Sequence, residues 1–164
     1  MDERIYNRNR KWTRKTFLDN FTIAEERHAA QRLLDVARDS GAAFHWGPSG
    51  VSIRMRCSLW GNPVSVAWLY PPSTTDNGWM KTRDFSFGVA ILDEEPPPPP
   101  ALSTVLKQWA DQFGADSFTI RVVKASGLPV KGVDAWSVDY PDAVQHLDLL
   151  SKRLANILTK LKSL

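Results

Sequence analysis

Two carboxylates near the middle of the sequence are the first side chains whose spacing could do chemistry. Asp93 and Glu95 follow a run of alternating apolar residues, so we expect them at the end of a strand. Carboxylates that converge at such a point can hold Mg²⁺ and activate water for hydrolysis of a phosphodiester. The site would need a further acid from another element, with Asp134 and Asp139 as the candidates. The pair therefore supports one enzymatic hypothesis, a metal-dependent nuclease or phosphohydrolase.

Other catalytic patterns are missing from the sequence. The histidines and the single cysteine, Cys57, do not have the spacing of zinc ligands, and Cys57 falls on the apolar side of an alternating run. There is no G-x-S-x-G motif, and no glycine-rich loop carries the lysine that a phosphate loop needs. Outside the acidic pair we expect no catalytic residues, no metal and no cofactor. Binding is therefore preferred to catalysis.

Basic side chains gather at the two ends of this 164-residue chain, whose net charge is +3. Residues 151–164 contain basic side chains and no acid, and in residues 1–15 the basic residues outnumber the acids. A cationic segment that includes aromatic rings can follow phosphates and stack on bases, whereas the alternative is a solvated tail that aids solubility. The candidate binding residues of this N-terminal arm are Arg8, Arg10, Lys11, Trp12 and Arg14.

A pair of arginines forms a second candidate contact. Arg54 and Arg56 are two residues apart in an alternating run, so they share one side of a strand, and Arg121 could join them from another strand. Guanidinium groups in a row can hold carboxylates or phosphates by paired hydrogen bonds. The alternative is a solvent-facing strand whose charges discourage pairing with other chains.

The stretch from Tyr70 to Trp79 is the third candidate. It places prolines between aromatic residues at the end of a predicted hairpin, and loops in such positions often bind ligands or peptides. The alternative is a proline-stiffened connection that Trp79 holds in place.

Hydrophobic periodicity predicts the elements that position these residues. Helices are expected from Thr22, where Thr22 and Glu25 form a capping box, to about Ser40, and again over 102–114 and from Asp139 onward. Strands are expected over 43–46, 51–59, 64–70, 79–92, 118–123 and 133–138. Gly61–Asn62 reads as a hairpin turn, after which Val64, Val66, Trp68 and Tyr70 share one face.

These elements predict an α+β fold, in which an antiparallel meander sheet of five to six strands carries three amphipathic helices on one face. A flexible basic arm, residues 1–15, precedes a single domain, residues 16–164, with a polyproline spacer at Pro96–Pro100 inside it. The last helix has leucines at alternating spacings of three and four. They could pack inside the fold or form a homodimer through the C-terminal helix.

The bulk composition restricts where such a protein works. One cysteine excludes an internal disulfide, and no stretch approaches the ~20 apolar residues of a membrane span. The charged beginning of the chain does not resemble a secretory signal. We therefore expect a cytoplasmic protein without membrane contact. The function predicted is a non-catalytic binding module that engages a protein or nucleic-acid partner through its basic arm and its arginine-bearing strand.

Overall fold

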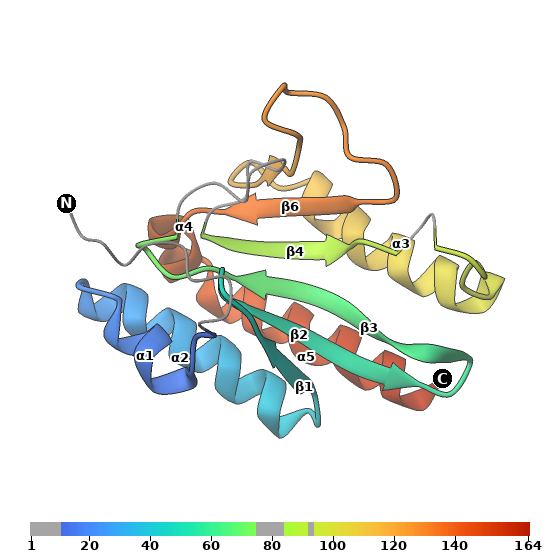
Figure 1. Ribbon diagram of the computed structural model, residues 1–164, viewed down its shortest axis with the longest axis horizontal. Coiled ribbons are helices and arrows are strands. Elements are labelled where there is room, and N and C mark those ends of the chain that lie inside the picture. The colour runs from blue at the N-terminus through green and yellow to red at the C-terminus, as the bar shows by residue number, and fades with distance from the viewer. Residues whose placement is uncertain (1–10, 75–83, 92–93) are drawn as a thin grey trace.

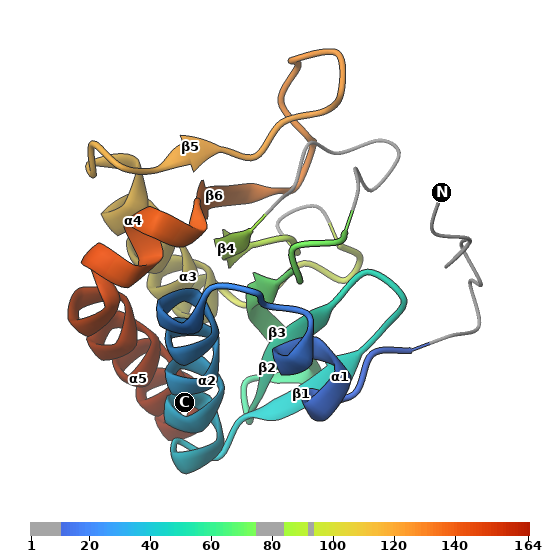
Figure 2. The same ribbon diagram turned by 90° about the vertical axis from the view of Figure 1, so that its left-hand side faces the viewer.

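Six antiparallel strands form one sheet in the order β1-β2-β3-β4-β6-β5 (Figure 1 and Figure 2). The computed structural model describes residues 11–74, 84–91 and 94–164. The strands are β1 (Ala43–Trp46), β2 (Val51–Cys57), β3 (Trp60–Leu69), β4 (Phe85–Val89), β5 (Ile120–Arg121) and β6 (Asp134–Val138). The predicted α+β class with an antiparallel meander is confirmed.

The helices are α1 (Arg14–Asp19), α2 (Ala24–Asp39), α3 (Pro100–Gly114), α4 (Tyr140–Gln145) and α5 (Leu147–Ser163). Figure 2 shows α2, α3 and α5 on one side of the sheet. Helix α5 packs on β2 and α2, whereas α3 packs on β4 and β6. Within the described ranges no helix covers the opposite side, which we call the helix-free face; in β2 it is the side of Ser52, Arg54 and Arg56.

The core lies between the sheet and these helices, and aromatic rings form much of it. Phe87 of β4 stacks on Phe113 of α3 with ring centroids 5.2 Å apart, and Trp109 meets Phe113 edge-on at 4.7 Å. The indole N–H of Trp109 donates to the carbonyl oxygen of Gly88 at 3.1 Å. Because that donor is fully buried, the hydrogen bond removes the cost of desolvating it.

The leucine stripe of the last helix is buried within the chain. Leu150, Leu154 and Leu161 of α5 are 0% exposed. Packing inside the fold, one of the two alternatives for this stripe, is therefore confirmed. A homodimer stays a prediction, and it would have to use other residues of α5.

Helix ends differ from the sequence prediction. The capping box predicted at Thr22 and Glu25 is wrong, because Ile23 occupies the N-cap of α2 and no side chain caps it. A capping box forms instead at α1, where Thr13 and Thr16 exchange hydrogen bonds of 2.9 and 3.2 Å. The helix expected from Asp139 is interrupted at His146, which separates α4 from α5.

Turns and strand ends also differ. The hairpin turn predicted at Gly61–Asn62 lies earlier, between the end of β2 at Cys57 and the start of β3 at Trp60. The strand expected over 118–123 is reduced to Ile120–Arg121, because the chain turns back on itself at residues 124–128. Strand β4 covers part of the predicted 79–92, whose other residues lie partly outside the described ranges.

The folded domain begins earlier than residue 16. Helix α1 starts at Arg14, and the indole N–H of Trp12 donates to the carbonyl oxygen of Pro48 at 3.0 Å. The last part of the predicted flexible arm, residues 11–15, is therefore joined to the domain, and residues 1–10 lie outside the description. At the predicted Pro96–Pro100 spacer, the Glu95–Pro96 bond is cis and Pro100 is already the first residue of α3.

Candidate binding face of the sheet

The two arginines of β2 lie on the helix-free face. Ile53, Met55 and Cys57 are buried in the core, and side chains of a strand alternate between its two faces. Arg54 and Arg56 therefore point away from the helices, as their spacing predicts. Arg56 is exposed and Arg54 is half-buried.

A line of residues crosses the same face, with one residue from each strand. The pairing registers connect neighbours in this line across all six strands. We call it the transverse row; it consists of His45, Ser52, Trp68, Ser86, Ser137 and Ile120. Its members share a face because directly paired residues of antiparallel strands point to the same side.

Serines flank the tryptophan in the transverse row. Ser52 and Ser86 lie on either side of Trp68 and are 6% and 1% exposed. The hydroxyl of Ser52 accepts a hydrogen bond from Nε of Arg54 at 3.0 Å. The hydroxyls of Ser86 and Ser137 lie 3.1 Å apart and are hydrogen-bonded to each other. The helix-free face thus carries hydrogen-bonded hydroxyl groups on interior strands of the sheet.

Trp68 differs from the other described tryptophans. Trp60 and Trp109 belong to the core, and the remaining ones pack against it: Trp12, Trp46 and Trp136. Among the residues that the structure describes, Trp68 is the tryptophan outside this cluster, and it is half-buried. Its indole is therefore held at the sheet surface and not by the helices.

The sequence prediction placed Trp68 on the apolar face, and this was wrong. The register shifts between Ile53 and Arg54: Ile53 pairs with Ala67 and Arg54 pairs with Ser65, which leaves Val66 as an extra residue in β3. Such a bulge reverses the alternation beyond it, so Trp68 and Val66 do not share a face. A bulge depends on pairing between strands, and the alternation of β3 alone does not reveal it.

The charge of the helix-free face is not neutralised within the described residues. Five other arginines lie 3.6 Å or less from a carboxylate oxygen: Arg14, Arg32, Arg38, Arg121 and Arg153. Arg54 and Arg56 have no carboxylate partner in the described part of the chain, and Arg54 bonds through Nε alone. Because unpaired guanidinium groups attract anions, this face suits an anionic ligand.

The third arginine does not join the other two. Arg121 lies on β5, at the far end of the strand order from β1 and β2. Its guanidinium carbon lies 5.6 Å from the centre of the Trp136 ring, and its side chain is 3.6 Å from a carboxylate oxygen of Asp134. The expectation that Arg121 joins Arg54 and Arg56 was wrong, because β3, β4 and β6 separate β5 from β2 and its charge is already paired with Asp134.

The described arm residues lie elsewhere. Arg14 forms an ion pair of 2.6 Å with Asp35 of α2, and Trp12 is docked on the turn at Pro48. Lys11 is exposed, while Arg8 and Arg10 lie outside the described residues. The structure does not bring Trp12 or Arg14 to the helix-free face.

The aromatic loop is only partly described. Tyr70 is 7% exposed, and its carbonyl oxygen accepts a hydrogen bond from the hydroxyl of Tyr140 at 2.5 Å. Trp79 lies outside the described ranges. Tyr70 therefore helps to hold the end of the sheet together, and the binding role of this loop stays a prediction.

Of the acidic pair in the enzymatic hypothesis, the structure describes one residue. Glu95 is exposed, and Asp93 lies outside the described residues. Within residues 11–74, 84–91 and 94–164, no three His, Cys, Asp or Glu side chains gather as metal ligands would. The described helices also include none long and apolar enough to cross a bilayer.

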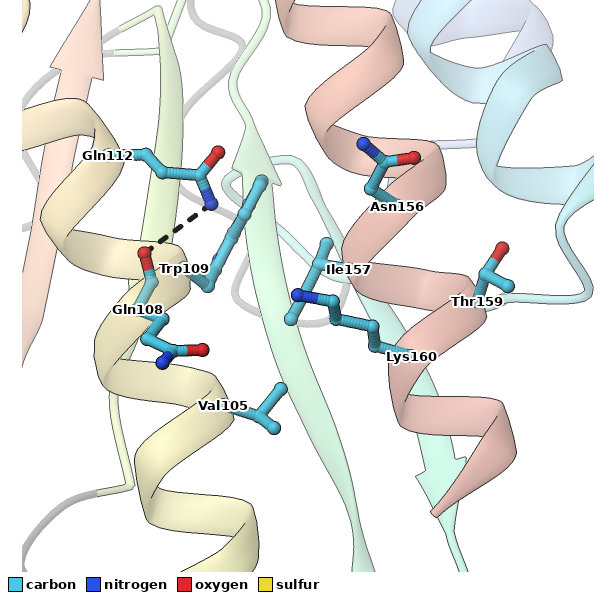
Figure 3. Close-up of a pocket in the computed structure, with 8 residues that line it drawn as sticks. All are labelled: Val105, Gln108, Trp109, Gln112, Asn156, Ile157, Thr159 and Lys160. Carbon is cyan, nitrogen blue, oxygen red and sulfur yellow. Dashed lines mark hydrogen bonds between the residues drawn. The ribbon is translucent and has the colours of Figure 1, made fainter.

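A groove of about 300 Å³ opens between α3 and α5, on the side of the sheet that carries the helices (Figure 3). Val105, Trp109 and Ile157 give it apolar contacts, and the remaining lining residues are polar: Gln108, Gln112, Asn156, Thr159 and Lys160. The side-chain amide of Gln112 donates to the carbonyl oxygen of Gln108 at 3.4 Å. The polar part of the lining combines amides with the hydroxyl of Thr159 and the single charged group, Lys160.

Comparison of the chain with protein-family models, with curated proteins and with solved structures finds no match.

Proposed function

We propose that this protein is a non-catalytic binding module whose helix-free face engages an anionic partner. The observation that supports the proposal most is the position of Arg54 and Arg56 on that face without a carboxylate partner among the described residues. The basic N-terminal arm is proposed as a second contact with the same partner.

Unpaired arginines on the helix-free face favour binding over a structural role. An arginine that serves the fold is normally paired, as Arg153 is with Asp116, where both side chains are 15% exposed. Arg56 is exposed and makes no hydrogen bond with the described residues. Guanidinium groups bind phosphate or carboxylate oxygens through charge-assisted hydrogen bonds, and such binding weakens as salt rises.

The proposal is tested with the double variant Arg54→Gln/Arg56→Gln. Its matched control is Lys107→Gln/Lys152→Gln, which removes the same charge from exposed positions on α3 and α5. The probes are a fluorescent mixed-sequence oligonucleotide and fluorescent polyglutamate, titrated at low and moderate salt. We expect the arginine variant to bind its preferred probe about tenfold more weakly, whereas the lysine variant stays close to the wild type.

Thermal melts accompany these titrations, and both variants should melt close to the wild type. If neither probe binds, or if both variants lose affinity equally, the helix-free face is not the binding site. A shortened chain that begins at Lys11 then separates the contribution of the arm from that of the sheet. We expect it to retain the part of the binding that depends on Arg54 and Arg56.

A further inference from the structure

We infer that the anionic partner is a single-stranded nucleic acid, with a base stacked on Trp68 and the neighbouring phosphates held by Arg54 and Arg56. The inference rests on the proposed function and names the ligand class of the same face. It is carried by the position of Trp68 in the transverse row, next to the arginines and outside the described core.

Trp68 lies where a stacking platform is needed. It belongs to β3, which stands between β2 and β4 in the interior of the sheet. An indole is the largest apolar side chain, and the fold buries Trp60 and Trp109 in the core. Trp68 instead occupies the face that the helices leave uncovered, where a π-surface can contact a ligand.

The neighbours of Trp68 are small. Ser52 and Ser86 occupy the adjacent positions of the transverse row. Because serine is short, these neighbours leave room beside the indole on the helix-free face. Sheets that bind single-stranded RNA use aromatic rings to stack bases, and stacking is tolerant of sequence because every base has a flat π-face.

Arg54 lies close enough to Trp68 to contact the phosphate backbone of a nucleic-acid strand whose base stacks on the indole. Arg54 is two residues from Ser52, which pairs directly with Trp68. Such diagonal neighbours are about 7–8 Å apart, within reach of a long side chain. Arg54 bonds to Ser52 through Nε, and its terminal amino groups have no partner among the described residues. They remain available for a phosphate beside a stacked base.

A second ring extends the row at its edge. His45 of β1 is exposed and pairs with Ser52, two strands away from Trp68. At the usual strand spacing this separation is about 10 Å. A duplex keeps its bases stacked inside, so it would contact the arginines without using either ring. The arrangement therefore selects single strands over duplexes.

The test compares one mixed-sequence oligonucleotide as a single strand and as a duplex. The variants are Trp68→Leu, Trp68→Phe and Arg54→Gln/Arg56→Gln, measured by fluorescence anisotropy at several salt concentrations. We expect Trp68→Leu to bind the single strand about tenfold more weakly with an unchanged salt slope, and Trp68→Phe to recover most of the loss. The arginine variant should reduce the salt slope by about 1.4, for two phosphate contacts.

The outcomes separate this inference from the proposed function. Two outcomes overturn the inference and leave the proposed function standing. In the first, arginine-dependent binding favours polyglutamate over the oligonucleotide. In the second, the arginine-dependent affinity is equal for duplex and single strand and is unaffected by Trp68→Leu. Binding that ignores Arg54 and Arg56 with every probe overturns both. If Trp68→Leu does not fold, Trp68→Phe decides: its tryptophan fluorescence should be quenched less by the single strand than that of the wild type.

Discussion

Gly88 is a residue at which the packing of two strands leaves no room for a side chain. Its φ is +145°, and an added Cβ would lie 2.2 Å from the carbonyl oxygen of Asp134 and 2.5 Å from Cα of Ala135. We expect Gly88→Ala to lower the free energy of unfolding by more than about 2 kcal/mol, because β4 and β6 would have to separate.

Gly61→Ala is the control for this change, since no atom lies within 4 Å of the added Cβ. Its free energy of unfolding should stay within about 0.5 kcal/mol of the wild type. Urea denaturation of both variants makes the comparison. Equal losses would show that the cost does not come from the contact between β4 and β6.

Glu26 gives a prediction about pH. Burial, followed by the negative charges of Asp139 and Glu25, raises the pKa of Glu26 above its usual value. The folded state therefore binds the proton more tightly than the unfolded state, and the carboxylate form carries an energetic penalty in the fold. This penalty is present above the raised pKa and is lost as the pH falls through it.

Glu26→Gln removes the titrating carboxyl group, so a comparison with the wild type shows whether ionisation of Glu26 stabilises or destabilises the fold. The difference in Tm, wild type minus variant, should become more positive as the pH falls from neutral to about pH 4. Thermal melts across this range measure it. A difference that becomes more negative toward acid would mean that the fold lowers the pKa of Glu26.

At the scale of elements, α5 holds the helical layer to the sheet. Leu154 is 0% exposed and belongs to the core, whereas Leu149 on the same helix is 38% exposed. We expect Leu154→Ala to cost about 2–5 kcal/mol of unfolding free energy, because the lost side chain leaves a cavity in the core. Leu149→Ala should cost far less. Similar losses in chemical denaturation would mean that the helix is not anchored by its buried stripe.

Long elements with a clear period could be predicted from the sequence. The apolar residues of β2 alternate over its whole length, and the leucines of α5 recur through several turns, so both patterns average over many residues. Helix α1 could not be predicted in this way, since it has only 6 residues. It depends on the cap at Thr13 and on the docking of Phe17, whose ring centre lies 5.6 Å from that of Trp46.

At the scale of the whole molecule, only part of the candidate site could be predicted from the sequence. The shared face of Arg54 and Arg56 follows from local spacing alone. The position of Trp68 requires the bulge at Val66, and the exclusion of Arg121 requires the order in which β4, β6 and β5 assemble. The bulge and the strand order both arise from pairing between segments far apart in the sequence, and a local hydrophobic pattern does not contain that information.

The strands of the sheet also become shorter toward both of its edges. The edge strands are β1, with 4 residues, and β5, with 2, while β3 between them has 10. An edge strand with many free backbone groups can template the growth of fibrils, and short edges limit that growth. The long apolar strands of this protein are thereby enclosed by neighbours, and the short edge strands leave few free backbone groups on which a fibril could grow.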